Sequence, residues 1–279
     1  MEAEELLKQY AAGERNFKGI TLIGADLRAA DLSDVNFTRG SLRDVKMVGT
    51  NLTGANLREV QIIGTSMAGA NLSEANLIGT NMPKTNLSNA NLSGANLRAS
   101  IAREANLTQV NAKGANLTET NFTQANLTGA NFTDATMVRV NLIKAVGIGA
   151  ILENVNLTNA LMNESILEGA NLTNAIISGA MLSGANLSGA DLSKCTAIGA
   201  TLSEANLSGA KLRVANISWT TLRGANLSGA NLFRAKLSWS NLSGAIMIKT
   251  VLIDAKLNRT NFRDADLRGA IMPDGTTVG

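Results

Sequence analysis

Residues 185–189 read Ala-Asn-Leu-Ser-Gly, and close variants of these five residues fill almost the whole chain. The large apolar residue at the centre of each unit recurs at every fifth position from Phe17 to Met272, without insertion or deletion. Small residues replace it only at Ala102, Ala112, Gly147 and Ala197. A period this regular indicates a repeat architecture, in which neighbouring units bury their apolar faces against each other.

Each position of the repeat has its own residue type. The residue two places before the centre is small, most often Ala, and the residue between them is mostly Asn. Side chains two places apart on an extended backbone point to the same side, so the small and the large residue both point inward and Asn points outward. The last position is often Gly, which suits a turn with positive φ. Each pentapeptide is therefore predicted to be a short extended side followed by a corner.

A helix does not fit this period, because five residues advance a helix by about 500° and would rotate the apolar stripe out of register. Four such sides make one coil, and successive coils stack identical positions about 4.8 Å apart. The sequence therefore predicts an all-β fold: a quadrilateral β-helix over residues 15–274, with roughly 13 coils.

The two ends of the chain differ. Residues 2–12 predict one short α-helix, in which Leu6 and Tyr10 share an apolar face and which Gly13 can end. Residues 1–14 are interpreted as an N-terminal cap that covers the first coil, and residues 275–279 as a C-terminal tail. No comparable lid is expected at the C-terminal end, so we expect it to pack against another chain in a homodimer, through the centres of the last coil: Leu257, Phe262, Leu267 and Met272.

Composition narrows the classes of function. The 279 residues carry 25 Lys+Arg and 22 Asp+Glu, with one Cys and no His. This excludes a disulfide scaffold and the usual zinc clusters, and it removes His as a general base. No acid pair or nucleophile stands out from the repeat, so the sequence predicts no enzyme, no metal and no cofactor. The first residues lack a signal sequence and no stretch is long and apolar enough to span a membrane, so a cytoplasmic location is expected.

The repeats at residues 185–189, at 125–129 (Ala-Asn-Leu-Thr-Gly) and at 265–269 (Ala-Asp-Leu-Arg-Gly) resemble the A(D/N)LXX motif of pentapeptide-repeat proteins. The resemblance covers nearly the whole chain and implies a right-handed quadrilateral β-helix. Both ends of the chain are similar to those of cyanobacterial members, one group of which regulates heterocyst differentiation through protein contacts. Other members of the family protect DNA gyrase by mimicking duplex DNA.

Exceptions to the pattern predict local features. Phe122 and Phe132 follow Ala102 and Ala112 by one coil, so the rings are expected to fill the space left by the small centres; alternatively, Ile101 turns inward. Gly147 predicts a local bulge in preference to a functional loop. Cys195 occupies a small inward position and is interpreted as a core residue rather than a reactive thiol.

Function is expected on the outward positions. Trp219 and Trp239 occupy the same corner of adjacent coils, with Arg259 next, so we expect a ring stack capped by a cation–π contact. With the nearby outward apolar residues, this stack is predicted to form one surface that binds a partner protein; the alternative is self-packing that only covers a corner. Apolar residues also replace polar ones in two other groups, which either bind a partner or only stabilise the stacked coils. One group is Phe233, Ile246, Ile248, Val251 and Ile253, and the other is Ile151, Leu161, Ile166, Ile176 and Met181. The repeated Asn residues are expected to form a structural ladder rather than a ligand-binding surface.

The sequence therefore predicts a rigid, non-enzymatic scaffold or regulator that binds a partner protein through its outer faces; the sequence does not name the partner. The alternative is a DNA-mimicking modulator of DNA gyrase or topoisomerase. Such a mimic needs an acidic face spaced like phosphates, whereas the net charge here is +3 and the outward charges are mixed in sign. Direct nucleic-acid binding is not expected, because Lys and Arg form no long stripe.

Overall fold

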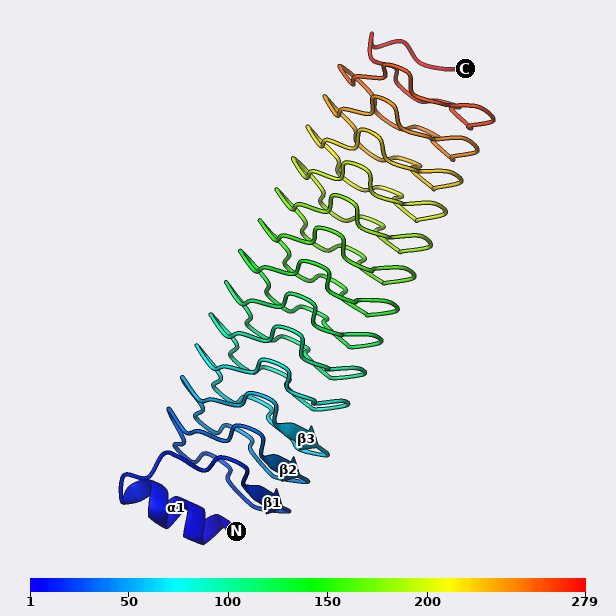
Figure 1. The fold of residues 1–279 in the computed structure, drawn as a ribbon. Coiled ribbons are helices and arrows are strands. Elements are labelled where there is room, and N and C mark those ends of the chain that lie inside the picture. The colour runs from blue at the N-terminus through cyan, green and yellow to red at the C-terminus, as the bar shows by residue number, and fades with distance from the viewer. The chain divides into compact units, whose positions relative to one another are not determined.

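The computed structural model describes residues 1–279 and divides into two compact units, Met1–Asn141 and Leu142–Gly279. The first unit contains the helix α1 (Ala3–Ala11) and three short strands, β1 (Thr21–Ile23), β2 (Ser41–Arg43) and β3 (Gln61–Ile63). The strands pair in parallel in the order β1-β2-β3, as Figure 1 shows. Leu22 pairs with Leu42 and Leu42 pairs with Ile62, so each coil consists of four pentapeptides.

The same parallel pairing, always one coil apart, continues through isolated bridges within both units. In a typical repeat, the Leu52 amide donates to the Asn71 carbonyl oxygen at 2.7 Å, and the Asn71 amide donates to the Thr50 carbonyl oxygen at 2.9 Å. These bonds satisfy backbone groups between neighbouring coils, which the few residues of one side could not satisfy alone. The predicted extended sides are therefore present, and the number of coils in the chain and their handedness stay predictions.

A hydrogen-bonded turn closes most sides. The Ala55 amide donates to the Leu52 carbonyl oxygen at 3.0 Å, and Gly54 between them has a φ of 65°. Non-glycine residues at the same position of other repeats also adopt positive φ, between 52° and 65°. The frequent Gly of the sequence pattern is thus explained by a left-handed corner that recurs along the chain.

The core consists of the two inward positions. The centres from Phe17 to Leu252 and nearly all of the small residues before them are buried. Where the small residue is Thr or Ser, its hydroxyl commonly donates to a carbonyl of the preceding coil, as Thr50 does to Leu27 at 2.7 Å. Ala102, Ala112, Phe122 and Phe132 are all fully buried. Ile101 remains 42% exposed, so the alternative that it turns inward is wrong.

The predicted bulge at Gly147 is also wrong. The Gly147 amide donates to the Ile166 carbonyl oxygen at 2.7 Å, and the Ala150 amide donates to the Gly147 carbonyl oxygen at 3.1 Å. Repeats whose central residue has a large side chain make the same two backbone hydrogen bonds. The backbone path therefore does not depend on a large side chain at the centre.

The helix α1 covers the first coil, beside which it lies in Figure 1. It buries Leu6 and Tyr10, and the Tyr10 hydroxyl donates to the Ser33 carbonyl oxygen at 2.8 Å. The Arg15 guanidinium lies 3.7 Å from the centre of the Tyr10 ring. The helix thus covers apolar side chains at this end of the coil stack, and the boundary of the cap at residue 14 stays a prediction.

The sequence predicts no covering segment at the C-terminal end, but the structure has a short one. The tail turns back, Thr277 forms an antiparallel bridge with Ile271, and the Val278 amide donates to the Ala270 carbonyl oxygen at 2.9 Å. This hairpin satisfies part of the last backbone edge. The last four centres nevertheless remain only half-buried, unlike their counterparts elsewhere: Leu257, Phe262, Leu267 and Met272.

Candidate functional site

The two tryptophans of the chain form a parallel stack on one corner of the second unit. The ring centroids of Trp219 and Trp239 are 4.8 Å apart and the ring planes differ by 6°. This separation equals the spacing of paired strands, so each ring stands out from the corner of its own coil. The rings remain 59% and 43% exposed. Stacking therefore covers the facing surfaces and leaves a large aromatic area in contact with solvent.

Arg259 caps this stack as the sequence predicts. Its guanidinium carbon lies 4.3 Å from the centre of the Trp239 ring. Trp219 and Trp239 have φ values of 60° and 65°, in the left-handed region. Because corners throughout the chain adopt this conformation, the positive φ follows from the fold and does not by itself mark a functional site.

The other five candidate residues form a separate apolar surface. They lie in the sides that meet at Lys249: Ile246 and Ile248 before it, Val251 and Ile253 after it, with Phe233 in the preceding coil. The Arg234 amide donates to the Ile253 carbonyl oxygen at 2.9 Å, which places Phe233 beside Ile253. Ile246 is 41% exposed and the other four are half-buried.

The structure does not bring the two groups together. Lys249 follows Trp239 by two pentapeptides, which is half of a coil. The corner that carries the tryptophans and the corner at Lys249 therefore lie on opposite sides of the coil. One flat contact could not cover both surfaces, and each has to be tested separately.

Phe233 is flanked by positive charge. The guanidinium carbons of Arg213 and Arg234 each lie 4.9 Å from its ring centre, and Arg234 also forms an ion pair with Asp254 at 3.2 Å. The ring is thus shielded by its neighbours. Two roles are open to this residue: stabilising adjacent coils and binding a partner. The contacts of Phe233 fit the first role at least as well as the second.

The second outward apolar group is also at the surface. Four of its five members are exposed, namely Ile151, Ile166, Ile176 and Met181, and Leu161 is half-buried. Leu161 pairs with Met181 in a parallel bridge. Leu161 and Met181 share one side of the coil, whereas Ile151, Ile166 and Ile176 each lie on a different side, so the five residues do not form one patch.

The Asn residues form the predicted ladder. The Asn36 side-chain amide donates to the Asn16 side-chain oxygen at 3.0 Å, while the Asn36 oxygen accepts from the Thr38 amide at 3.0 Å. Asn91 and Asn71 repeat the inter-coil bond at 3.1 Å. The side chains are thus occupied by structural bonds, which explains why Asn fills this position.

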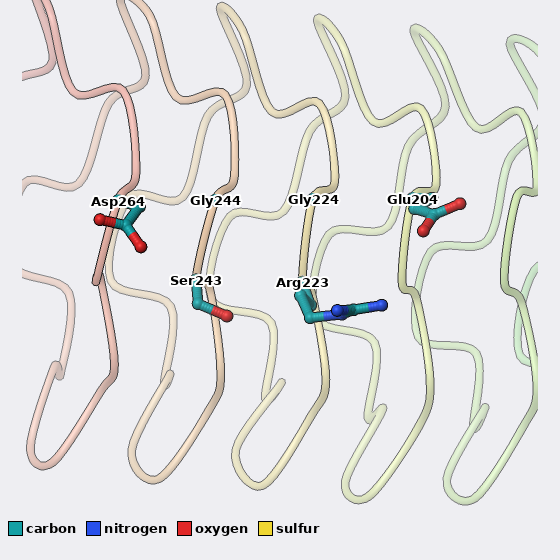
Figure 2. A pocket seen from close by; sticks show the side chains of 6 residues that line it. All are labelled: Glu204, Arg223, Gly224, Ser243, Gly244 and Asp264. Atoms are coloured by element: carbon teal, nitrogen blue, oxygen red, sulfur yellow. The ribbon is translucent and has the colours of Figure 1, made fainter.

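A shallow depression on another corner was not anticipated from the sequence. It has a volume of about 340 Å³ and is lined by Glu204, Arg223, Gly224, Ser243, Gly244 and Asp264 (Figure 2). Gly224 and Gly244 occupy the corner in two successive coils, with Glu204 and Asp264 on either side, as Figure 2 shows. The signal in the sequence is this pair of glycines, one coil apart, between two acidic residues. The hollow arises because two corner side chains are missing.

Cys195 is buried, and burial raises the pKa of its thiol to about 12. A thiol that stays protonated at neutral pH is a poor nucleophile. The inward position that the sequence predicts is therefore confirmed.

The family model described as "Pentapeptide repeats (8 copies)" matches the chain in segments from residue 16 to residue 273. The chain belongs to the pentapeptide-repeat family. No helix of the structure has the length and apolar character needed to cross a membrane.

Three solved structures illustrate the likeness. HetL, a pentapeptide repeat protein involved in heterocyst differentiation regulation from the cyanobacterium Nostoc sp. strain PCC 7120, is 33% identical over 100% of both chains, with a TM-score of 0.34. A pentapeptide repeat protein of the Arabidopsis thaliana thylakoid lumen is 32% identical over 42% of this chain and 68% of its own, with a TM-score of 0.24. QnrB1, a plasmid-mediated fluoroquinolone resistance protein, is 19% identical over 80% of this chain and 93% of its own, with a TM-score of 0.30. A comparison with curated proteins gives no match.

Proposed function

We propose that this chain is a non-enzymatic interaction protein, which binds a partner protein through the outer surface of its coils. The observation that carries the proposal is the Trp219–Trp239 stack, in which both rings stay largely exposed although a corner of this fold can be formed by Gly alone. Exposed Trp is enriched at the energetic centres of protein interfaces. The interior of the coils is filled by buried side chains, whereas enzymes commonly bind their substrates in concave pockets, and this supports the same proposal.

The site can be tested without disturbing the fold. Asn occupies the same left-handed corner at Asn159 and Asn174, with φ values of 56° and 59°. Trp219→Asn combined with Trp239→Asn should therefore keep the coil and remove the aromatic surface. The wild type and this double variant would each be used to capture proteins from extracts of the source organism, followed by mass spectrometry.

We expect at least one protein to be captured by the wild type and lost with the Trp double variant. Ile246→Asn is the matched control, because Asn226 occupies the same column one coil earlier and pairs with Ile246. This control alters the opposite surface and should retain the same protein. Equal capture by the wild type and the Trp double variant would refute the assignment of the site.

DNA mimicry directed at gyrase is the alternative. The charged residues at the corners support a protein-binding function over DNA mimicry, because basic and acidic residues of successive coils form ion pairs. Lys84 pairs with Glu104 at 3.4 Å, and Lys144 pairs with Glu164 at 3.4 Å. Such pairs cancel the negative potential that a mimic needs. A gyrase supercoiling assay checks this directly, and protection of the enzyme by the purified chain would favour the alternative.

We also propose that the C-terminal end packs against a second copy. Support comes from Leu257, Phe262 and Leu267, which remain half-buried beneath the end of the chain where other centres are fully buried. Light scattering over a range of concentrations tests this, with Phe262→Ser as the variant that should shift the mass toward the monomer. A wild-type monomer at high concentration would contradict it.

A further inference from the structure

The Trp219 ring has one face that is not covered by the corner side chain of a neighbouring coil. Trp239 covers one face of this ring in the next coil, and Gly199 occupies the same corner in the coil before. Gly199 has a φ of 68°, and no atom would lie within 4 Å of a Cβ built on it. The second face of Trp219 therefore borders a slot that holds no side chain from the corner of the preceding coil.

The dimensions of the slot suit a flat ring. Successive corners of this column are one coil apart, and the Trp pair shows that two rings fit this step at 4.8 Å. Aromatic pairs prefer centroid separations of about 4.5–7 Å. Ile198, which precedes Gly199, is 41% exposed and adds apolar surface beside the slot. An incoming ring would therefore bury apolar area on two sides.

The side that leads to this corner is basic. In four successive coils it comprises residues 196–199, 216–219, 236–239 and 256–259, which contain Lys236, Lys256 and Arg259 and no Asp or Glu. Lys236 and Lys256 pair with each other in a parallel bridge, and both are exposed. Neither forms one of the ion pairs of the structure, whereas such pairs neutralise several basic side chains elsewhere in the chain. Like charges placed side by side favour an anionic partner.

We propose that this surface binds an acidic segment of a partner protein, whose aromatic side chain enters the slot over Gly199 and stacks on Trp219. Carboxylates of the same segment lie against Lys236 and Lys256. The proposal rests on the proposed function and specifies the chemistry of the partner at that site. A protein segment fits better than a nucleic acid, because the preceding coils carry Ile176, Thr196 and Asn216 in the lysine column and give no continuous basic track for a phosphate backbone.

Fluorescence reports on this surface alone, because Trp219 and Trp239 are the two Trp residues of the chain. The probe is a capped pentapeptide, Glu-Asp-Phe-Asp-Glu, titrated into the full chain at low and at moderate salt. Three controls are the same peptide with Ala in place of Phe, the same peptide with Lys in place of each acid, and an oligothymidylate. We expect the acidic Phe peptide to change the emission, and the Ala peptide to bind about threefold to tenfold more weakly because it lacks the ring stack.

Matched glycine variants locate the binding. Gly199→Phe fills the slot, and Gly229→Phe makes the same change at a corner of another column, where φ is 66° and no atom lies within 4 Å of the added Cβ. The first should abolish binding of the acidic Phe peptide and the second should retain it. Lys236→Gln with Lys256→Gln should weaken binding and reduce its dependence on salt.

Several results would overturn the proposal: no response to the acidic Phe peptide, equal or tighter binding of the Lys peptide or the oligothymidylate, or unchanged binding by Gly199→Phe. These results are separable from failure of the proposed function. A partner protein lost with the Trp double variant, together with no peptide response, would retain the site and reject the acidic, ring-bearing partner.

Discussion

Gly40 lies one coil above Ile20, and the missing side chain of the glycine is matched by the large side chain of the isoleucine. A Cβ built on Gly40 would lie 3.0 Å from the Ile20 carbonyl oxygen and 3.2 Å from its Cγ2 atom. Both residues occupy the small inward position, which holds Ala in most repeats. The core thus keeps its volume by pairing an oversized residue with an undersized one across two coils.

Gly40→Ala should therefore destabilise the chain although Ala is the preferred residue of this column. The added methyl also meets the Phe37 carbonyl oxygen at 2.8 Å, so the local backbone has to move. We expect a loss of about 1–3 kcal/mol in the free energy of unfolding, measured by urea denaturation. Ile20→Ala combined with Gly40→Ala should recover part of that loss. An unchanged midpoint for Gly40→Ala would show that the coil relaxes freely there.

The Trp219–Trp239 stack should couple the two residues energetically. In a double-mutant cycle built from Trp219→Asn and Trp239→Asn, we expect a coupling of about 0.5–1.5 kcal/mol in the free energy of unfolding. Arg259→Gln combined with Trp219→Asn is the control pair, because Arg259 lies over Trp239, and the effects of these two changes should add. Additive effects of Trp219→Asn and Trp239→Asn would mean that the rings do not stack in solution.

Val214 is the corner residue whose replacement should stabilise the fold. Its φ is 61°, which a β-branched side chain adopts at a cost, and 48% of the residue is exposed. Val214→Asn should raise the free energy of unfolding by about 0.5–1 kcal/mol, because Asn tolerates the left-handed region. Val138→Asn, outside the left-handed position, gains nothing from this relief and serves as the control. A lower melting temperature for Val214→Asn would contradict the argument.

Most of the fold can be predicted from the repeat period. Residues two places apart point to the same side of the backbone, and residues four pentapeptides apart lie next to each other in successive coils. Leu52, Asn71 and Gly54 can be assigned as inward, outward and corner residues from these two spacings alone. The bulge expected at Gly147 is wrong for a physical reason. The inter-coil hydrogen bonds are made by the backbone, so a centre without a side chain does not change the path.

Features outside the period could not be predicted in the same way. The bridge between Ile271 and Thr277 depends on a reversal of the chain that no column describes. The hollow at Gly224 and Gly244 depends on which corner side chains are absent. Trp239 and Lys249 are close in sequence, which suggests a single surface. Their spacing of half a coil, however, predicts that they lie on opposite sides. The stack itself was predictable, since a spacing of one full coil places Trp219 beside Trp239.

Cys195 gives a prediction about alkaline pH. Burial raises the pKa of its thiol from 9.0 to about 12, so between these values the unfolded chain loses the thiol proton and the folded chain retains it. The folded state then binds more protons than the unfolded state, and its stability falls as the pH rises through this range. Well below pH 9 the thiol is protonated in both states and contributes no pH dependence.

Cys195→Ala should remove this contribution while it preserves the packing, because Ala fills the same inward position in neighbouring coils, as Ala175 and Ala215 do. The difference in free energy of unfolding between wild type and variant should be nearly constant up to pH 9. Above it, the wild type should lose about 1.4 kcal/mol per pH unit relative to the variant, as expected for one proton. Urea denaturation at several pH values measures both curves. Lysine and tyrosine titrations are common to the two chains, so they cancel in the difference. Parallel curves above pH 9 would show that the thiol ionises in the folded chain as easily as in the unfolded one.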